Sequence, residues 1–251
     1  MHPFVLWFHK LGSPPYFHRL AGRFLPWLYA LALLAGAMGL YGGLVIAPAD
    51  YQQGDAFRMI YVHVPCAYMS LFAYAFMAAN SFVALVWRIK LSETLAMASA
   101  PIGAAFTFIA LVTGSLWGKP MWGTWWTWDA RLTSELVLLF LYLGVIGLHH
   151  AIEDARQAAR AAAFLALIGI VNLPIVHYSV LWWNTLHQGQ TLAAAKISPS
   201  MAWPLLSMIF ATQMYFFASL LARSRATLLA LEAGKDWVRQ IALTQKVDAH
   251  G

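Results

Sequence analysis

The chain has 251 residues, of which 61% are apolar and only 10% are charged, and its formal net charge is +6. Soluble globular domains contain about 25% charged residues, so this composition excludes one and predicts a polytopic membrane protein. The single cysteine, Cys66, excludes an internal disulfide, and the lack of a C-x-x-C-H motif excludes haem attached through thioethers.

Six stretches are long and apolar enough to cross a bilayer, which requires about 20 mostly apolar residues per helix. We therefore predict an all-α integral membrane fold in which six transmembrane helices form one bundle and one domain over residues 1–251, with a Trp-rich loop or short helix on the outer side. The residues before the first span have no signal-peptide features and are expected to be a short basic lead. The predicted spans are residues 25–46, 60–87, 95–116, 134–152, 161–181 and 203–222.

Lys and Arg are distributed unequally between the two sides of these spans. Twelve of the 16 lie on one side, and the remaining four are Arg58, Lys119, Arg131 and Lys196. Because basic loops are retained in the cytoplasm, both termini and a tail over residues 223–251 are expected to be cytoplasmic. The positive charge is then a topological signal with affinity for anionic lipid, and it does not indicate nucleic-acid binding. The outer loops are predicted at residues 47–59, 117–133 and 182–202.

The middle outer loop contains an unusual run of tryptophan, WGKPMWGTWWTWDAR. Indole rings bury a large area with few rotatable bonds, so such a cluster is suited to a large, flat, apolar ligand. An anchoring belt at the membrane interface explains the same composition equally well. The run contains five of the chain's 12 tryptophans, namely Trp117, Trp122, Trp125, Trp126 and Trp128.

Three of the nine histidines lie near the outer side of the predicted spans. His63, in YVHVP, begins the second span, and His187, in NTLHQG, lies in the third outer loop. Two imidazoles on opposite sides of a haem iron give a six-coordinate site, so His63 and His187 are candidate axial ligands. His177, inside the fifth span, is the rival ligand. For each histidine alone, a structural role is the commoner use.

Three charged residues flank the candidate site. Arg58 and Arg131 are candidate partners for haem propionates, because a guanidinium binds a carboxylate in a fork; snorkelling from a helix end is the alternative. Asp129 directly precedes the fourth span, where it is expected to cap the helix and to order the Trp loop. No P-loop, H-E-x-x-H, G-x-S-x-G or dinucleotide motif is present, so we expect no enzyme activity, with any ATP hydrolysed by a partner.

The run WGKPMWGTWWTWDARLTSELVLLFLY resembles the signature of the WWD family of haem-handling membrane proteins. Within that family, the segments YVHVP, NLPIVHYSV and WWNTLHQG are similar to the CcmC family, the haem exporter protein C of cytochrome c maturation by bacterial System I. The similarity covers about Pro26 to Gly189, and the chain does not depart from the motif. The related CcmF and CcsA proteins are larger and have more spans.

The resemblance implies that haem b is held as a transported substrate at the periplasmic face of the bacterial inner membrane. It places the Trp segment under the porphyrin and His63 and His187 on the iron. It also implies delivery to the haem chaperone CcmE, release driven by the ABC subunits CcmA and CcmB, and assistance by the small subunit CcmD. The alternatives are a b-type cytochrome subunit with His177 as a ligand, and a solute transporter, which the scarcity of charge in the spans disfavours.

Overall fold

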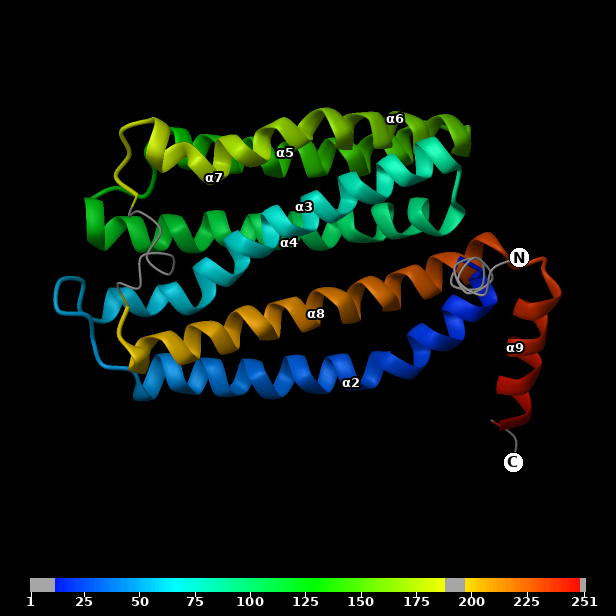
Figure 1. Cartoon of the computed structure of the whole chain (residues 1–251), viewed down its shortest axis with the longest axis horizontal. Helices are drawn as coiled ribbons and strands as arrows, with labels where there is room; N and C mark the ends of the chain where they lie inside the picture. Colours follow the sequence, from blue (N-terminus) through cyan, green and yellow to red (C-terminus); the bar gives the residue numbers. More distant parts are fainter. Residues whose placement is uncertain (1–11, 188–196, 249–251) are drawn as a thin grey trace, which may run out of the picture.

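The structure is a computed structural model that describes residues 12–187 and 197–248. Over these ranges the chain forms helices joined by short connections, and no β-strand occurs in them. Figure 1 shows long helices lying side by side, with the start of α2 and the end of α8 at the same end of the bundle. The helices are α2 (Pro14–Tyr41), η1 (Gly42–Ile46), η2 (Asp55–Met59), α3 (Ile60–Trp87), α4 (Lys90–Trp122), α5 (Ala130–Ala151), α6 (Ala155–Ile168), η3 (Gly169–Val171), α7 (Asn172–Trp182), α8 (Pro199–Leu231) and α9 (Asp236–Asp248).

Six helical segments of the described chain are long and apolar enough to span a membrane, which confirms the predicted fold class. Four of these segments have 33 residues, and at 1.5 Å per residue such a helix is about 50 Å long, well beyond the hydrocarbon thickness of about 30 Å. The helices therefore extend past the apolar stretches that the sequence marks. The segments are Pro14–Ile46, Asp55–Trp87, Lys90–Trp122, Ala130–Ala151, Ala155–Trp182 and Pro199–Leu231.

The largest difference from the prediction concerns the start of the Trp-rich loop. We expected a loop from residue 117, but α4 continues to Trp122 and ends at Gly123, whose φ of 76° gives the left-handed C-cap that glycine favours. Gly118 and Pro120 both lie inside α4, and Gly118 is buried against the Trp122 ring. The Trp run is therefore part helix and part loop.

Buried hydrogen bonds between helices fix the centre of the bundle. The Tyr142 hydroxyl in α5 donates to the Ser70 carbonyl in α3 at 2.7 Å, and the Ser70 hydroxyl donates to Glu135 Oε1 at 2.7 Å. The Tyr74 ring packs edge-on against Tyr142, with 5.0 Å between centroids. Since a polar group without a partner is costly inside a membrane, these bonds hold α3 and α5 in one register.

Gly103 in α4 allows the Tyr142 ring to reach this network, because a Cβ at Gly103 would overlap the phenol. We predict that Gly103→Ala lowers the free energy of unfolding by about 2 kcal/mol through overpacking. Gly147→Ala in α5 is the matched control, because no neighbouring atom lies within 4 Å of its added Cβ. Thermal unfolding of the purified protein in detergent measures both, and equal midpoints for the two variants would contradict the packing described.

Candidate functional site

His63 and His187 lie together at one end of the bundle, although they belong to distant parts of the chain. Their ring centroids are 6.4 Å apart, and the ring planes are inclined by 38°. A metal ion bound at about 2 Å by one nitrogen of each imidazole places the ring centroids about 6 Å apart. The pair is therefore spaced to bind one ion between the two rings.

The His63 ring is oriented by α4, and its hydrogen bonds define its tautomer. Nδ1 lies 3.0 Å from the Ala110 carbonyl oxygen and 3.2 Å from the Thr113 hydroxyl, which itself donates to the Ile109 carbonyl at 2.6 Å. A carbonyl can only accept, so Nδ1 carries the proton and donates it to Ala110. Nε2 then carries no proton and keeps its lone pair. An imidazole nitrogen in this state is the kind that binds a metal.

Two further residues of α4 shape the space around His63. A Cβ at Gly114 would lie 3.0 Å from His63 Cε1, so glycine permits the close approach of the imidazole. The Trp117 ring meets His63 edge-on with 5.8 Å between centroids, and its indole N–H donates to Gln53 Oε1 at 3.0 Å. Ala110, Gly114 and Trp117 follow one another at i, i+4 and i+7, so a single stripe of α4 faces His63.

His187 is held by two residues of the Trp run and by Thr185 of its own loop. Its ring lies 5.0 Å from the Trp122 ring between centroids, and its Nδ1 is 3.8 Å from Asp129 Oδ2. The latter distance exceeds a direct hydrogen bond, so this contact is electrostatic. The backbone N–H of His187 donates to the Thr185 hydroxyl at 3.1 Å, and that hydroxyl donates to Asp129 Oδ2.

Asp129 also caps α5, as predicted, because its Oδ1 accepts from the Leu132 backbone N–H at 2.8 Å. Burial of the carboxyl raises the pKa of Asp129, but His187 and the hydrogen bonds from Thr185 and Leu132 outweigh that effect and lower the pKa to about 2. Asp129 is therefore a carboxylate at neutral pH. It joins the start of α5 to the segment that carries His187.

The five tryptophans of the run divide into two groups. Trp117 and Trp122, on the last turns of α4, contact the histidine rings. Trp125 and Trp128 are 53% and 79% exposed, and the Trp126 ring meets Trp128 edge-on at 5.6 Å between centroids. The Trp126 indole nitrogen is buried and has no hydrogen-bond partner within the described part of the chain. One group thus faces the histidines and the other forms an outer aromatic surface.

The two candidate arginines are bound to other parts of the protein. Arg58 donates to Asp55 Oδ1 at 2.9 Å and to the Gly43 carbonyl at 2.7 Å, which joins η2 to η1. Arg131 donates to the carbonyls of Val176 at 3.1 Å and His177 at 3.4 Å, which joins α5 to the middle of α7. These bonds fix the segments that lead to His63 and to His187.

His177 occupies a different environment from the paired histidines. Its ring packs edge-on against the neighbouring Tyr178 ring, with 4.7 Å between centroids. Its carbonyl accepts from Arg131, so it takes part in positioning α7. The structure thus brings His63 and His187 together, and it places His177 in contact with residues of its own helix and of α5.

Comparison with known proteins tests the resemblance drawn from the motifs. The family model described as Heme exporter protein C matches residues 7–239. The chain belongs to the Heme exporter protein C family. The chain is 54% identical to the Heme exporter protein C of Escherichia coli strain K12 over 235 residues, which cover 94% of this chain and 96% of that protein.

Two further relatives of this Heme exporter protein C family member extend the comparison. The Heme exporter protein C of Haemophilus influenzae is 46% identical over 243 residues, covering 96% of this chain and 99% of that protein. A putative cytochrome c biosynthesis ccmC-like mitochondrial protein of Marchantia polymorpha is 43% identical over 209 residues, covering 82% of this chain and 88% of that protein. The family predicted from the Trp run and its flanking segments is therefore confirmed.

Several residues that build the site in this Heme exporter protein C family member were not predicted from the sequence. The residues of α4 that face His63 follow the helical period. They would have been identified if the predicted helix had been extended past residue 116. Gln53 and Thr185 carry no such signal, because their roles depend on loops that meet only in the fold. These residues are Gln53, Ala110, Thr113, Gly114 and Thr185.

Substitution of Asp129 separates its capping role from its charge. Asn caps helices as well as Asp, so Asp129→Asn retains the cap, whereas Asp129→Ala loses a further contribution of about 1 kcal/mol. Because the folded-state pKa is lowered, the stabilisation due to charge is present above the ordinary carboxyl pKa and is lost as the pH falls towards about 2. Unfolding measured at neutral and acidic pH should show wild type and Asp129→Asn converging in acid. A difference that does not change with pH would contradict this role for the charge.

Proposed function

We propose that this chain binds haem b as a transported substrate between His63 and His187 and delivers it to the haem chaperone CcmE. The spacing of 6.4 Å between the two ring centroids is the observation that carries the proposal. The tautomer of His63 supports it, because the nitrogen available to the iron is the one that α4 leaves without a proton. The relatives are named as haem exporter proteins, which supports haem as the substrate.

Two imidazoles fill both axial positions of a haem iron and leave no position open for chemistry. The site is therefore suited to holding haem, and we propose that the chain has no catalytic turnover of its own. The Asp129 carboxylate beside His187 favours a positively charged iron at this position. Trp117 and Trp122 supply apolar aromatic surface next to the two ligands.

The remaining candidate residues have proposed roles at the edge of this site. We propose that Arg58 and Arg131 bind the haem propionates. Each guanidinium has more N–H groups than it donates to the backbone carbonyls, and the others are proposed to donate to the propionates. Trp125 and Trp128 are exposed, and aromatic residues are enriched where proteins bind partners. We propose that this outer aromatic surface, together with Trp126, receives the chaperone.

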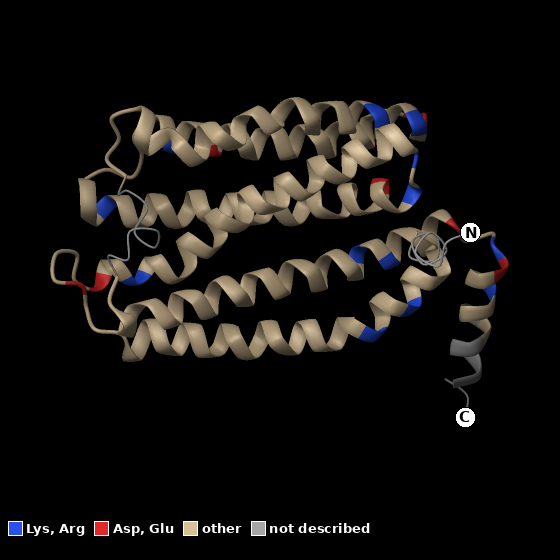
Figure 2. Ribbon diagram, viewed as in Figure 1, with Lys and Arg blue, Asp and Glu red and all other residues tan. Residues whose placement is uncertain are grey.

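The distribution of basic residues supports the proposed orientation. Figure 2 shows that Lys and Arg gather at the end of the bundle where α2 begins and α8 ends, opposite the histidine pair. Basic segments are retained on the cytoplasmic side, so we propose that the histidine pair lies at the periplasmic face of the bacterial inner membrane. Both termini are then cytoplasmic, on the side from which the partner ABC subunits CcmA and CcmB hydrolyse ATP, and CcmD is the proposed small membrane partner.

The proposed ligands predict the spectrum of the purified protein. Wild type should show a low-spin haem spectrum with two histidine ligands, and the double variant His63→Ala, His187→Ala should lose it because both axial positions are vacated. His177→Ala is the control and should retain the spectrum. If the double variant retained the spectrum while His177→Ala abolished it, the site would be wrong and an electron-transfer cytochrome would be favoured.

The two groups of tryptophans predict two separable defects. Trp122→Ala should lower haem occupancy, because it removes the ring that packs on His187. Trp128→Ala should leave haem occupancy unchanged but reduce the transfer of haem to the chaperone, because this ring is 79% exposed. Haem content and covalent loading of the chaperone measure the two effects. Normal loading of the chaperone in both variants would contradict these roles and would indicate that the tryptophans form an anchoring belt at the membrane interface.

A further inference from the structure

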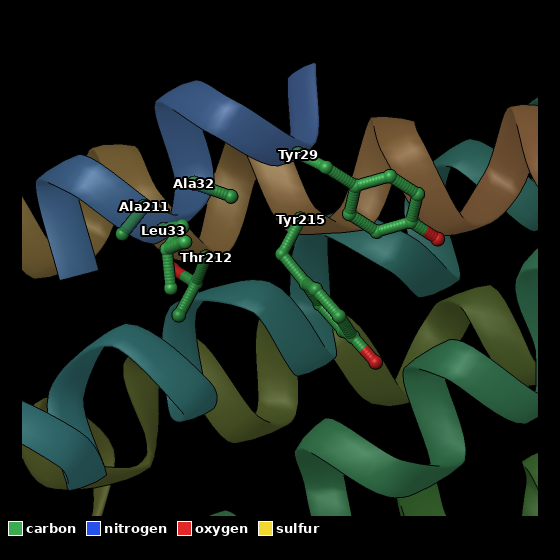
Figure 3. A pocket seen from close by; sticks show the side chains of 6 residues that line it. All are labelled: Tyr29, Ala32, Leu33, Ala211, Thr212 and Tyr215. Atoms are coloured by element: carbon green, nitrogen blue, oxygen red, sulfur yellow. The ribbon is translucent and has the colours of Figure 1, made fainter. Parts of the chain in front are cut away.

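An apolar cavity opens between α2 and α8, away from the histidine pair (Figure 3). Its volume is about 300 Å³. Leu33 on its rim is 73% exposed, so the cavity opens on the outside of the bundle, where the membrane lies. In Figure 3 the Tyr29 and Tyr215 rings stand beside one another. The lining residues are Tyr29, Ala32, Leu33, Ala211, Thr212 and Tyr215.

The same pair of helices carries a cluster of arginines at its basic end (Figure 2). Within the described ranges no carboxylate pairs with any member of the cluster, and the nearby Glu232 and Asp236 are bound to Lys90 and Arg239 instead. The cluster consists of Arg19 and Arg23 from α2, and Arg223 and Arg225 from α8.

Arg225 places this charge at the junction between the two helices. Its guanidinium lies over Gly22 of α2, since a Cβ there would be only 2.9 Å from Nη2. The Nε of Arg225 is buried and has no hydrogen-bond partner among the residues that the structure describes. A guanidinium that lies in a helix junction and has no carboxylate partner is suited to bind an anion from outside the chain.

The arginines and the cavity are separated by about the depth of one membrane leaflet. Tyr29 and Leu33 follow Gly22 at i+7 and i+11, which is one face of a helix. At 1.5 Å per residue they lie about 10 Å and about 16 Å further along α2. Half of a hydrocarbon core of about 30 Å is about 15 Å. An amphiphile with its anionic group on the arginines therefore has its hydrocarbon chain beside the cavity.

We propose that the α2–α8 junction binds one anionic phospholipid. Its phosphate is held by Arg225, with Arg19, Arg23 and Arg223 at the rim, and one acyl chain fills the cavity between Tyr29 and Tyr215. The bound lipid adds contacts between α8 and α2, the spanning helix with the smallest share of buried residues, at 17% of its apolar window. This site is separate from the proposed haem site, so either one can fail without the other.

Native mass spectrometry of the full-length protein in neutral detergent tests the proposal with two probes, phosphatidylglycerol and phosphatidylcholine of identical acyl chains. Wild type should retain phosphatidylglycerol in preference. The double variant Arg223→Gln, Arg225→Gln should weaken that binding about 25-fold, because each basic side chain at the membrane surface contributes about fivefold. The double variant Arg156→Gln, Arg160→Gln on α6 removes the same charge from exposed positions and should bind as wild type. Equal binding of the two lipids, or equal losses in the two double variants, would overturn the proposal.

Ala32→Phe tests the position of the acyl chain, because it fills the cavity and leaves the arginines in place. Wild type should bind long-chain phosphatidylglycerol more tightly than a short-chain form, and Ala32→Phe should abolish that difference while still preferring phosphatidylglycerol to phosphatidylcholine. If Ala32→Phe retained the wild-type preference for the long chain, the cavity would not hold the lipid and the proposal would be overturned.

Discussion

The hydrogen bond from His63 Nδ1 to the Ala110 carbonyl is the interaction on which the end of the bundle that carries the histidine pair depends. It requires α3 and α4 to pack closely, and Gly114 makes that approach possible. Once formed, it assigns the proton to Nδ1 and leaves Nε2 without one. A backbone contact inside a helix pair thus sets the tautomer of a partly buried histidine.

The second histidine depends on a different kind of support. His187 follows the end of α7, and Asp129 links its loop to the start of α5 through Thr185 and the cap on Leu132. Arg131 adds a further link, since it binds two carbonyls in the middle of α7. A histidine on α3 therefore faces a histidine held by a loop, and for the haem carrier that we propose this combination suits both retention and release of the cargo.

The sequence predicted the six spans because apolar length alone selects them, and it predicted His63, His187 and the Asp129 cap because each stands next to a recognisable helix start or motif. The ends of the helices were less predictable, because apolarity marks only the part of a helix within the hydrocarbon. For that reason Trp117 and Trp122 were assigned to a loop although they belong to α4. The contacts of Arg58 and Arg131 could not be predicted, because their partners include backbone carbonyls, which carry no sequence signal.

We propose that two imidazole nitrogens, one from each side, hold the haem iron in this chain. Electron paramagnetic resonance of the purified haem-bound protein, with its histidines labelled with ¹⁵N, measures the coupling of the iron to each histidine nitrogen. If both histidines bind the iron, the ferric protein gives a low-spin signal coupled to two histidine nitrogens. A high-spin signal, or coupling to only one histidine nitrogen, would rule out this pair of ligands.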